Sequence, residues 1–357
     1  MEDRRMSYRV PKEHGPKVAV IGGGHGLSNM LRGLKQYTEN ISAIVTVADD
    51  GGSSGMLRQD LGMPPPGDIR NCLEALANTE PLMRELMHYR FKDGSLAGQS
   101  FGNLFIAALN GISPSFDAAV SRMSEVLAIT GRVLPVTTAD VQLEAEFENG
   151  AFVVGESKIF YCKKKEDCRI KKVRLLPEHS KALPEAVTAI QEADILVLGP
   201  GSLYTSIIPN LLVDGIVEAI HSSDALKIYV ANVMTQEGET EGYTVSDHIQ
   251  ALFKHSTPDL FDLCLVNSAQ IPEEIARRYA EEGAELLHCD AEECSALGVE
   301  VVLRPISMVD QGYVRHDPDL LARELLQLHG SRSVRIAGER FNAKKGAYRM
   351  EKGETHP

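Results

Sequence analysis

The chain has 357 residues, of which 43% are hydrophobic and 24% are charged, and its formal net charge is −13 at pH 7. This composition can fill the core of one large α/β domain or of two modest domains. The negative charge argues against a general nucleic-acid surface or an anionic-membrane surface, and no apolar run reaches the length of a membrane-spanning helix. The six cysteines form no C-x-x-C pair. We therefore expect reduced thiols and a cytoplasmic protein without membrane insertion.

The first structured segment combines a strand with a glycine-rich turn. Residues 18–21 form a short apolar run, which predicts a strand that is buried on both faces. A helix with Leu27, Met30, Leu31 and Leu34 on one face is expected next. Between them lie the candidate ligand-binding residues Gly22, Gly23, Gly24, His25 and Gly26. The backbone N–H groups at such a helix start favour an anion, usually a phosphate, although a tight turn without a ligand is the alternative.

Two carboxylates follow the second predicted strand, residues 44–48. Asp49 and Asp50 stand at its carboxyl end, and Ser53 and Ser54 follow within a flexible stretch. This arrangement suits a divalent metal, with Asp50 as the candidate ligand, or a ribose or a proton acceptor. The simpler alternative is that both aspartates only begin a turn.

A proline-rich stretch precedes the next predicted helix. Asp68 is the predicted N-cap of this helix. Arg70 and Asn71 would project from its first turn toward the same crevice, although Arg70 can equally be a solvated surface charge. The span 69–129 is expected to be rich in helices.

Residues 133–176 have an alternating pattern that predicts an antiparallel insertion. Its expected strands are 133–136, 141–147, 151–154 and 170–176, and the Asn149-Gly150 pair predicts a hairpin turn between two of them. The lysine run 163–165 is expected to lie in a solvated turn.

Parallel character resumes with a predicted strand at 193–199 and a second glycine turn. Gly199, Gly201 and Ser202 are candidate ligand contacts there, and Ser202 can alternatively serve only as a helix cap. Two strand–glycine–helix units in one sheet indicate a crevice at a topological switch point. The strands predicted at 227–231 and 261–266 end at Asn232 and Asn267, whose amides can bind a base or sugar edge or form a local turn bond.

Two later residues can complete the crevice. Tyr279 has an aromatic face suited to stacking on a sugar or a base, although a packing role is the alternative. Arg315 offers a planar fork that matches a diphosphate, or it can pair with Asp317 or a helix end.

Several motifs in the same order resemble the YvcK family, within the CofD-like superfamily. They are residues 22–27 (GGGHGL), 47–55 (VADDGGSSG), 65–71 (PPGDIRN), 101–105 (FGNLF), 134–140, 198–204, 231–238 and 312–317. The resemblance covers about residues 15–330. It implies that Tyr279 and Arg315 contact the ligand, and the FGNLF motif adds Asn103 as a candidate ligand contact.

The YvcK resemblance also implies a function. It suggests a bacterial cytoplasmic regulator, a homodimer, that binds UDP-N-acetylglucosamine and supports cell shape and envelope synthesis during gluconeogenic growth. A protein partner in amino-sugar or envelope synthesis is expected, and no cofactor is required.

The other branch of the superfamily implies an alternative function. CofD is a magnesium-dependent transferase that moves a phospholactate group from a guanylyl-activated donor to a deazaflavin. The metal-associated aspartate of CofD resembles Asp50. Residues 65–71, however, depart from the S-P-D-L-D-T segment of CofD, which weakens the case for binding of the deazaflavin acceptor. Whether the chain is an enzyme therefore stays open. NAD is expected only as an adventitious ligand, because the glycine spacing does not match G-x-G-x-x-G.

The expected fold is a three-layer, Rossmann-like α/β domain with a mostly parallel sheet over residues 15–330. The antiparallel insertion is expected at about 133–176. A flexible N-terminal arm, 1–14, and a basic, disordered tail, 331–357, are expected at the two ends.

Overall fold

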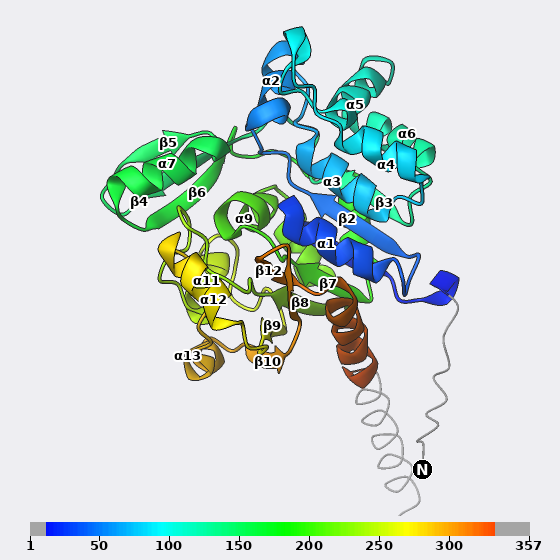
Figure 1. Cartoon of the computed structure of the whole chain (residues 1–357). Coiled ribbons are helices and arrows are strands. Elements are labelled where there is room, and N and C mark those ends of the chain that lie inside the picture. The colour runs from blue at the N-terminus through cyan, green and yellow to red at the C-terminus, as the bar shows by residue number, and fades with distance from the viewer. Residues whose placement is uncertain (1–11, 333–357) are drawn as a thin grey trace, which may run out of the picture.

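A seven-stranded parallel sheet forms the centre of the chain in the computed structural model, which describes residues 12–332 (Figure 1). The strand order is β10-β9-β8-β7-β1-β2-β3. The bounds are β1 (Val18–Gly22), β2 (Ile41–Val45), β3 (Arg132–Pro135), β7 (Ile195–Leu198), β8 (Leu226–Val230), β9 (Leu263–Asn267) and β10 (Glu300–Arg304). Every residue of β1, β2 and β7 is buried, as the apolar runs predict for central parallel strands.

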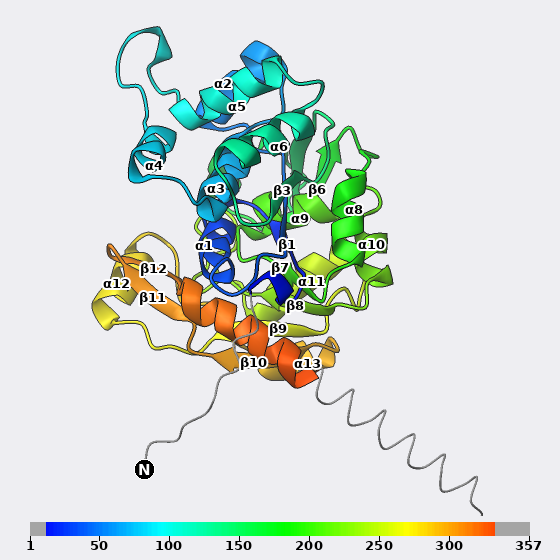
Figure 2. The same ribbon diagram turned by 90° about the vertical axis from the view of Figure 1, so that its right-hand side faces the viewer.

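Helices cover both faces of this sheet, so the predicted three-layer architecture is confirmed. Figure 2 shows α1 and α3 on one side of the sheet and α8 and α10 on the other. The α-helices up to the insertion are α1 (Gly24–Leu34), α2 (Gly52–Leu61), α3 (Gly67–Leu76), α4 (Pro81–His88), α5 (Phe101–Gly111) and α6 (Phe116–Val126). Those after it are α8 (Pro184–Gln191), α9 (Ile208–Leu211), α10 (Ile216–Ser222), α11 (Val245–Lys254), α12 (Glu273–Glu281) and α13 (Ala291–Ala296). Shorter turns are η1 (Lys12–His14), η2 (Gly94–Leu96) and the π-helix η3 (Leu203–Ile207).

The antiparallel insertion is present but smaller than predicted. It contains β4 (Gln142–Phe147), β5 (Phe152–Val154), β6 (Ile170–Leu176) and helix α7 (Glu156–Glu166), with the predicted hairpin turn between β4 and β5. The prediction that 133–136 belongs to it is wrong, because β3 pairs in parallel with β2 at the edge of the main sheet. An edge strand tolerates Pro135 and exposes part of one face, which produces the alternating pattern.

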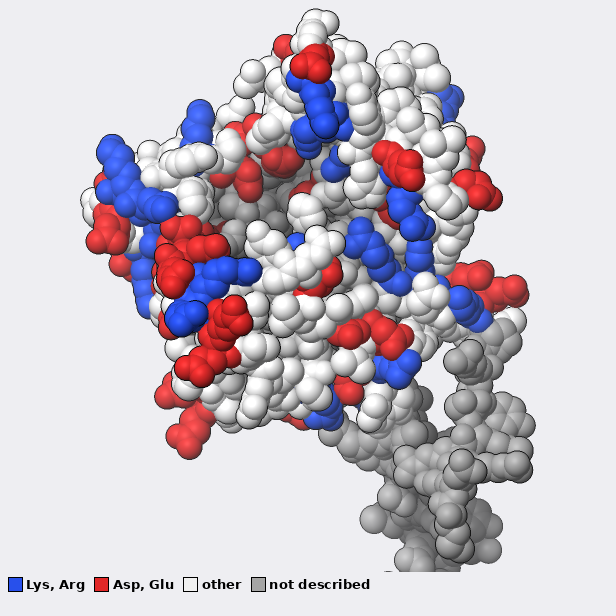
Figure 3. Space-filling model, viewed as in Figure 1, with Lys and Arg blue, Asp and Glu red and all other residues white. Residues whose placement is uncertain are grey.

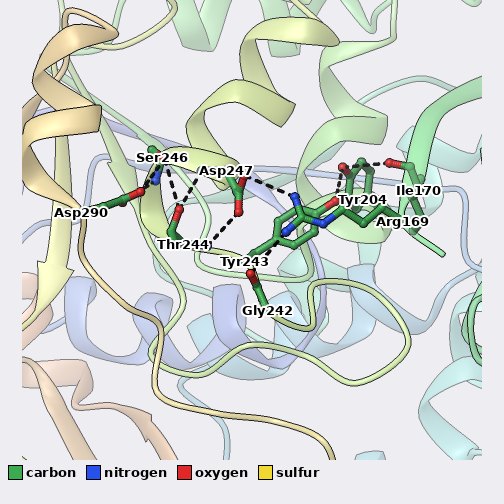
Figure 4. Close-up of polar contacts among 9 residues, drawn as sticks. All are labelled: Arg169, Ile170, Tyr204, Gly242, Tyr243, Thr244, Ser246, Asp247 and Asp290. Carbon is green, nitrogen blue, oxygen red and sulfur yellow. Dashed lines mark hydrogen bonds and ion pairs between the residues drawn. The ribbon is translucent and has the colours of Figure 1, made fainter. Parts of the chain in front are cut away.

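The insertion is fastened to the main domain at the start of β6. Arg169 stacks on the ring of Tyr243 at 4.7 Å and pairs with Asp247 at 3.5 Å (Figure 4). The hydroxyl groups of Tyr204 and Tyr243 are 3.0 Å apart, and that of Tyr204 lies 3.4 Å from the Ile170 carbonyl (Figure 4). These contacts hold the insertion beside the carboxyl edge of the sheet.

The lysine run does not lie in a turn, which corrects the prediction. Residues 163–165 end helix α7, and Lys163 is 9% exposed because it pairs with Glu241 at 3.1 Å. Lys164 pairs with Glu237 at 2.6 Å. The run therefore holds α7 against the 235–242 loop.

A hairpin, β11 (Ser307–Asp310) and β12 (Tyr313–His316), follows the sheet and leads into a helix over residues 318–332. Asn29 of α1 donates a hydrogen bond to the His316 carbonyl at 2.5 Å, which brings the hairpin beside the first glycine turn. Among the described residues, no helix is both long and apolar enough to cross a membrane. Apart from residues 12–14 and 331–332, the predicted arm and tail lie outside the described residues.

Candidate functional site

A cleft of about 560 Å³ opens at the carboxyl edge of the parallel sheet. It lies beside β1, where the strand order reverses. The sheet continues with β2 and β3 on one side of β1 and with β7 to β10 on the other. This is the topological switch point at which open α/β sheets bind ligands. Figure 3 shows a hollow near the centre of this face, with acidic and basic side chains beside it.

The helices α1, α2 and α3 all begin at this cleft, and none has a side-chain cap. Their N-cap residues are Gly23, Gly51 and Pro66, which offer no side-chain acceptor. By contrast, Ser115 and Thr244 cap α6 and α11 through their side chains. The N–H of Gly24 at the start of α1 donates to the Asp68 side chain, so the anion-binding capacity of the cleft rests on the remaining first-turn N–H donors and on the positive dipole ends of the three helices.

The walls at the first glycine turn lie very close together. A Cβ atom at Gly26 would be 2.7 Å from the Pro200 carbonyl oxygen, and one at Gly23 would be 2.6 Å from a carboxylate oxygen of Asp68. The absence of side chains at these positions therefore permits close contact between segments far apart in the sequence, such as Gly26 and Pro200, as well as access to a ligand.

Three arginines line the cleft, and they differ in their existing partners. Arg70 donates to the Ser100 hydroxyl at 2.5 Å, and Arg90 donates to the Gly98 carbonyl at 2.5 Å. Within residues 12–332, Arg315 has no carboxylate partner, and its guanidinium lies 5.7 Å from the Tyr313 ring centroid. Its planar fork is thus available for a diphosphate.

His25 and Tyr279 also line the cleft. Burial, followed by the charges of Arg315 and Arg70, lowers the pKa of His25, so its imidazole is neutral at pH 7. The Tyr279 hydroxyl accepts a hydrogen bond from the Val314 N–H at 3.0 Å, which joins α12 to β12. One face of the cleft is therefore formed by the hairpin and α12 together.

Three carboxylates from separate elements meet in the cleft: Asp49, Asp68 and Glu156. Burial and the nearby Asp49 raise the pKa of Asp68 to about 7. Burial, with Asp49 and Asp50 next, raises the pKa of Glu156 to about 8. At pH 7 the group therefore holds protons that isolated carboxylates would have lost.

Asp68 does not cap its helix, which corrects the prediction. It stands in the first turn of α3, whose N-cap is Pro66, and it accepts a hydrogen bond from the N–H of Gly24. The acidic side chain therefore connects α3 to α1 across the cleft floor.

The second glycine turn is closed by a carboxylate that the sequence analysis did not single out. Glu239 accepts hydrogen bonds from the N–H groups of Tyr204 and Thr205 at 2.9 and 3.0 Å. Burial raises its pKa to about 7. Ser202 does not cap η3 through its side chain but donates instead to Gln236. The N–H donors of Tyr204 and Thr205 at the start of η3 are thus already paired with a side chain of the protein.

The two asparagines proposed to bind a base or sugar edge are also engaged. Asn232 lines the cleft, but its amide accepts from the Gly201 N–H and donates to the Gly201 carbonyl. Asn267 forms the local turn bond with Ala269 and accepts from the Ile306 N–H. Both amides thus already form hydrogen bonds within the protein, and Asn232 also lines the cleft.

Most of the predicted site residues come together in this cleft. Those that line it are Gly23, Gly24, His25, Gly26, Asp49, Ser53, Ser54, Asp68, Arg70, Asn71, Asn103, Gly201, Ser202, Asn232, Tyr279 and Arg315. Gly22, Asp50 and Gly199 are not among the lining residues. Gly22 ends β1, and Gly199 has φ +77° just before Pro200, so both shape the backbone behind the cleft.

Comparison with known proteins agrees with this architecture. The family model described as 2-phospho-L-lactate transferase CofD matches residues 18–307. The putative gluconeogenesis factor of Thermoanaerobacterium thermosulfurigenes is 55% identical, over 88% of this chain and 97% of that protein. The gluconeogenesis factor of Bacillus subtilis is 50% identical, over 88% of this chain and 98% of that protein. The chain belongs to the YvcK branch of the CofD family.

A solved structure supports the fold of this YvcK-family chain. Protein BH3568 from Bacillus halodurans superposes with a TM-score of 0.84 at 46% identity, covering 87% of this chain and 99% of that one. The similarity therefore supports the architecture and not a ligand.

The CofD relationship raises the question of a magnesium ion at Asp50. The Asp50 carboxylate accepts the N–H of Ser157 at 2.8 Å, and it lies 2.5 Å from where a Cβ of Gly155 would stand. Among the described residues, no group of three or more histidine, cysteine or acidic side chains is arranged to hold a metal. The Asp50 carboxylate is thus directed at the start of α7.

Several lining residues were missed, although Gln236 and His316 lie within the family motifs 231–238 and 312–317. Glu156 starts helix α7 in the insertion, while Asn29, Arg90, Gln236 and His316 come from four further segments. Asn103, which the family motif did indicate, is 3% exposed and donates to Ser53, but its Oδ1 has no partner among the described residues. Only the tertiary packing brings the missed residues to the cleft.

Proposed function

We propose that this YvcK-family protein binds UDP-N-acetylglucosamine in the cleft and acts as a cytoplasmic, nucleotide-sugar-responsive regulator without obligatory turnover. The observation that carries the proposal is the convergence beside Arg315 of three helix starts whose N-cap residues provide no side-chain cap. The dipoles and N–H donors neutralise a diphosphate, and the guanidinium fork binds its oxygens. The relatives' name, gluconeogenesis factor, supports a role in gluconeogenic growth. Support of cell shape and envelope synthesis under those conditions is the further part of this proposal.

Signalling follows from the way the cleft is assembled. Its walls come from α1, from α7 of the insertion and from the hairpin with α12, so one ligand contacts elements far apart in the sequence. A ligand that binds one arrangement of these elements better shifts the population toward it. A protein partner in amino-sugar or envelope synthesis would then bind one arrangement of these elements better than the other. We also propose that the protein is a homodimer.

Isothermal calorimetry with UDP-N-acetylglucosamine, NAD and guanosine diphosphate, each with and without magnesium, tests the ligand. Saturable heat for the sugar nucleotide alone, with no product formed over hours, is expected. Absence of any binding by the wild-type chain to a uridine nucleotide sugar would refute the proposal.

The Arg315→Ala variant is expected to bind UDP-N-acetylglucosamine about 100-fold more weakly. Loss of a charged partner to a desolvated diphosphate typically costs about 2–5 kcal/mol, and each factor of ten in the dissociation constant is about 1.4 kcal/mol. Arg122→Ala is the matched control, because Arg122 is exposed on α6 and bonds only to the neighbouring 112–113 segment. Equal affinities for both variants would show that Arg315 does not contact the ligand.

A second candidate is a magnesium-dependent phosphoester transferase, which the description of the matching family model favours. The test is incubation with guanylyl-activated phospholactate, a deazaflavin and magnesium, followed by measurement of released guanosine monophosphate. Turnover that is lost in Asp50→Asn but kept in Asp60→Asn would favour the transferase over the regulator.

A further inference from the structure

Arg315 reaches the cleft from the β11–β12 hairpin without a carboxylate to hold its side chain. It lines the cleft, and its charge contributes to the lowered pKa of His25 on the opposite segment. The side chain is exposed, and an exposed arginine loses conformational entropy when a ligand orders it. Any contact that orders Arg315 before the ligand arrives therefore increases the affinity.

The ring of Tyr313 makes such a contact. Tyr313 and Arg315 are two residues apart in β12, so their side chains lie on the same face of the hairpin. The Arg315 guanidinium carbon is 5.7 Å from the centroid of the ring, which is within the range of a cation–π interaction. Tyr313 is not among the residues that line the cleft. The ring thus acts on Arg315 from outside the ligand space.

The ring is itself held from α12. The guanidinium carbon of Arg278 lies 5.2 Å from the centroid of the same ring, and Arg278 donates a hydrogen bond to the Gly312 carbonyl at the hairpin turn. Gly312 has φ +80°, and a Cβ atom there would stand 2.8 Å from Nη1 of Arg278. Glycine therefore permits both the turn and the close approach of Arg278.

An aromatic ring orders an arginine in a different way from a polar partner. Arg70 and Arg90 donate N–H groups to Ser100 and Gly98, and those donors are then no longer free for a ligand. A cation–π contact is an attraction to the ring face and requires no N–H donor. The ring of Tyr313 can therefore hold Arg315 while its charge and its N–H fork stay available for a diphosphate.

We propose that Tyr313 is a positioning residue that holds the Arg315 guanidinium at the cleft in the orientation that binds the ligand diphosphate. This inference rests on the proposed function. Its action passes through Arg315, and it requires the aromatic ring of Tyr313 but not the hydroxyl group.

The test is a double-mutant cycle, with the affinity for UDP-N-acetylglucosamine measured by calorimetry. Tyr313→Leu is expected to bind about threefold to fivefold more weakly than the wild type, the size of an exposed cation–π contact. Tyr313→Phe keeps the ring and should bind like the wild type. In the Arg315→Ala background, Tyr313→Leu should cause no further loss. Tyr161→Leu is the control, because Tyr161 is 72% exposed on α7 and does not line the cleft.

A spectroscopic measurement tests the contact without a ligand. Protons near the face of an aromatic ring are shifted upfield, so the Arg315 Nε–H resonance should lie upfield in the wild type and in Tyr313→Phe. It should move downfield in Tyr313→Leu.

The outcomes separate this inference from the function on which it rests. If the wild type binds no nucleotide sugar, the proposed function fails and the inference fails with it. If the wild type binds but Tyr313→Leu binds equally well, only the role of Tyr313 is overturned. An equal loss from Tyr313→Leu with and without Arg315 would also overturn that role, because the ring would then act independently of the guanidinium.

Discussion

Replacing Gly33 with alanine is expected to destabilise the protein by about 2–4 kcal/mol. Gly33 lies in α1 opposite the segment that follows β12, and a Cβ atom there would stand 1.8 Å from the Pro318 carbonyl oxygen. In an open helix interior, alanine is about 1 kcal/mol more favourable than glycine. A contact of 1.8 Å with backbone outweighs this gain, because neither helix can yield without losing its packing.

The destabilisation should also reach the cleft. Pro318 begins the helix over residues 318–332 immediately after Arg315 and His316, so moving it displaces the hairpin side of the site. Urea denaturation gives the free energy of unfolding, and calorimetry on the folded protein gives the ligand affinity. Gly111→Ala is the control, since Gly111 ends α5 and nothing lies within 4 Å of its added Cβ. Equal unfolding midpoints for the two variants would contradict the steric argument.

The Glu156→Gln variant is expected to be more stable than the wild type above pH 8, by up to about 4 kcal/mol. The folded-state pKa of Glu156 is raised from 4.5 to about 8 by burial and by Asp49 and Asp50. The folded protein therefore retains a proton that the unfolded chain releases between these two values. Its contribution to stability is fully present below pH 4.5 and is lost as the pH rises through 8.

Glutamine keeps the shape of the side chain but cannot ionise, so the variant escapes the cost of a buried charge among other carboxylates. The difference in unfolding free energy between variant and wild type should be small at pH 4 and should grow up to about pH 9. Glu85→Gln on exposed α4 removes the same charge and serves as the control. A difference independent of pH would show that Glu156 does not titrate near neutrality in the folded state.

Much of the parallel fold could be predicted from local patterns. The apolar runs before the glycine turns became β1 and β7, and the helical spacing of Leu27, Met30 and Leu34 became the buried face of α1. These patterns succeed because central parallel strands and amphipathic helices bury residues at fixed intervals. The edge strand β3 was misassigned because an edge position relaxes the requirement for two buried faces.

The candidate site was predictable only in part. Residues beside glycine turns were identified because strand-to-helix turns carry a local signature. Glu156 and Glu239 carry none, since the environment that makes each unusual comes from distant segments. For Asn232, local patterns left a ligand contact and a local turn bond equally open, and the fold shows its amide bonded to Gly201.

The alternation of strands and helices, the glycine turns and the family resemblance could all be read from local residue patterns. Those properties depend on the periodicity and backbone freedom of neighbouring residues. Which donors stay unpaired and which carboxylates keep their protons depends instead on the three-dimensional packing. Hydrogen-bond satisfaction and desolvation depend on atoms brought together from separate elements, such as Glu239 at the start of η3 and Ser157 at Asp50.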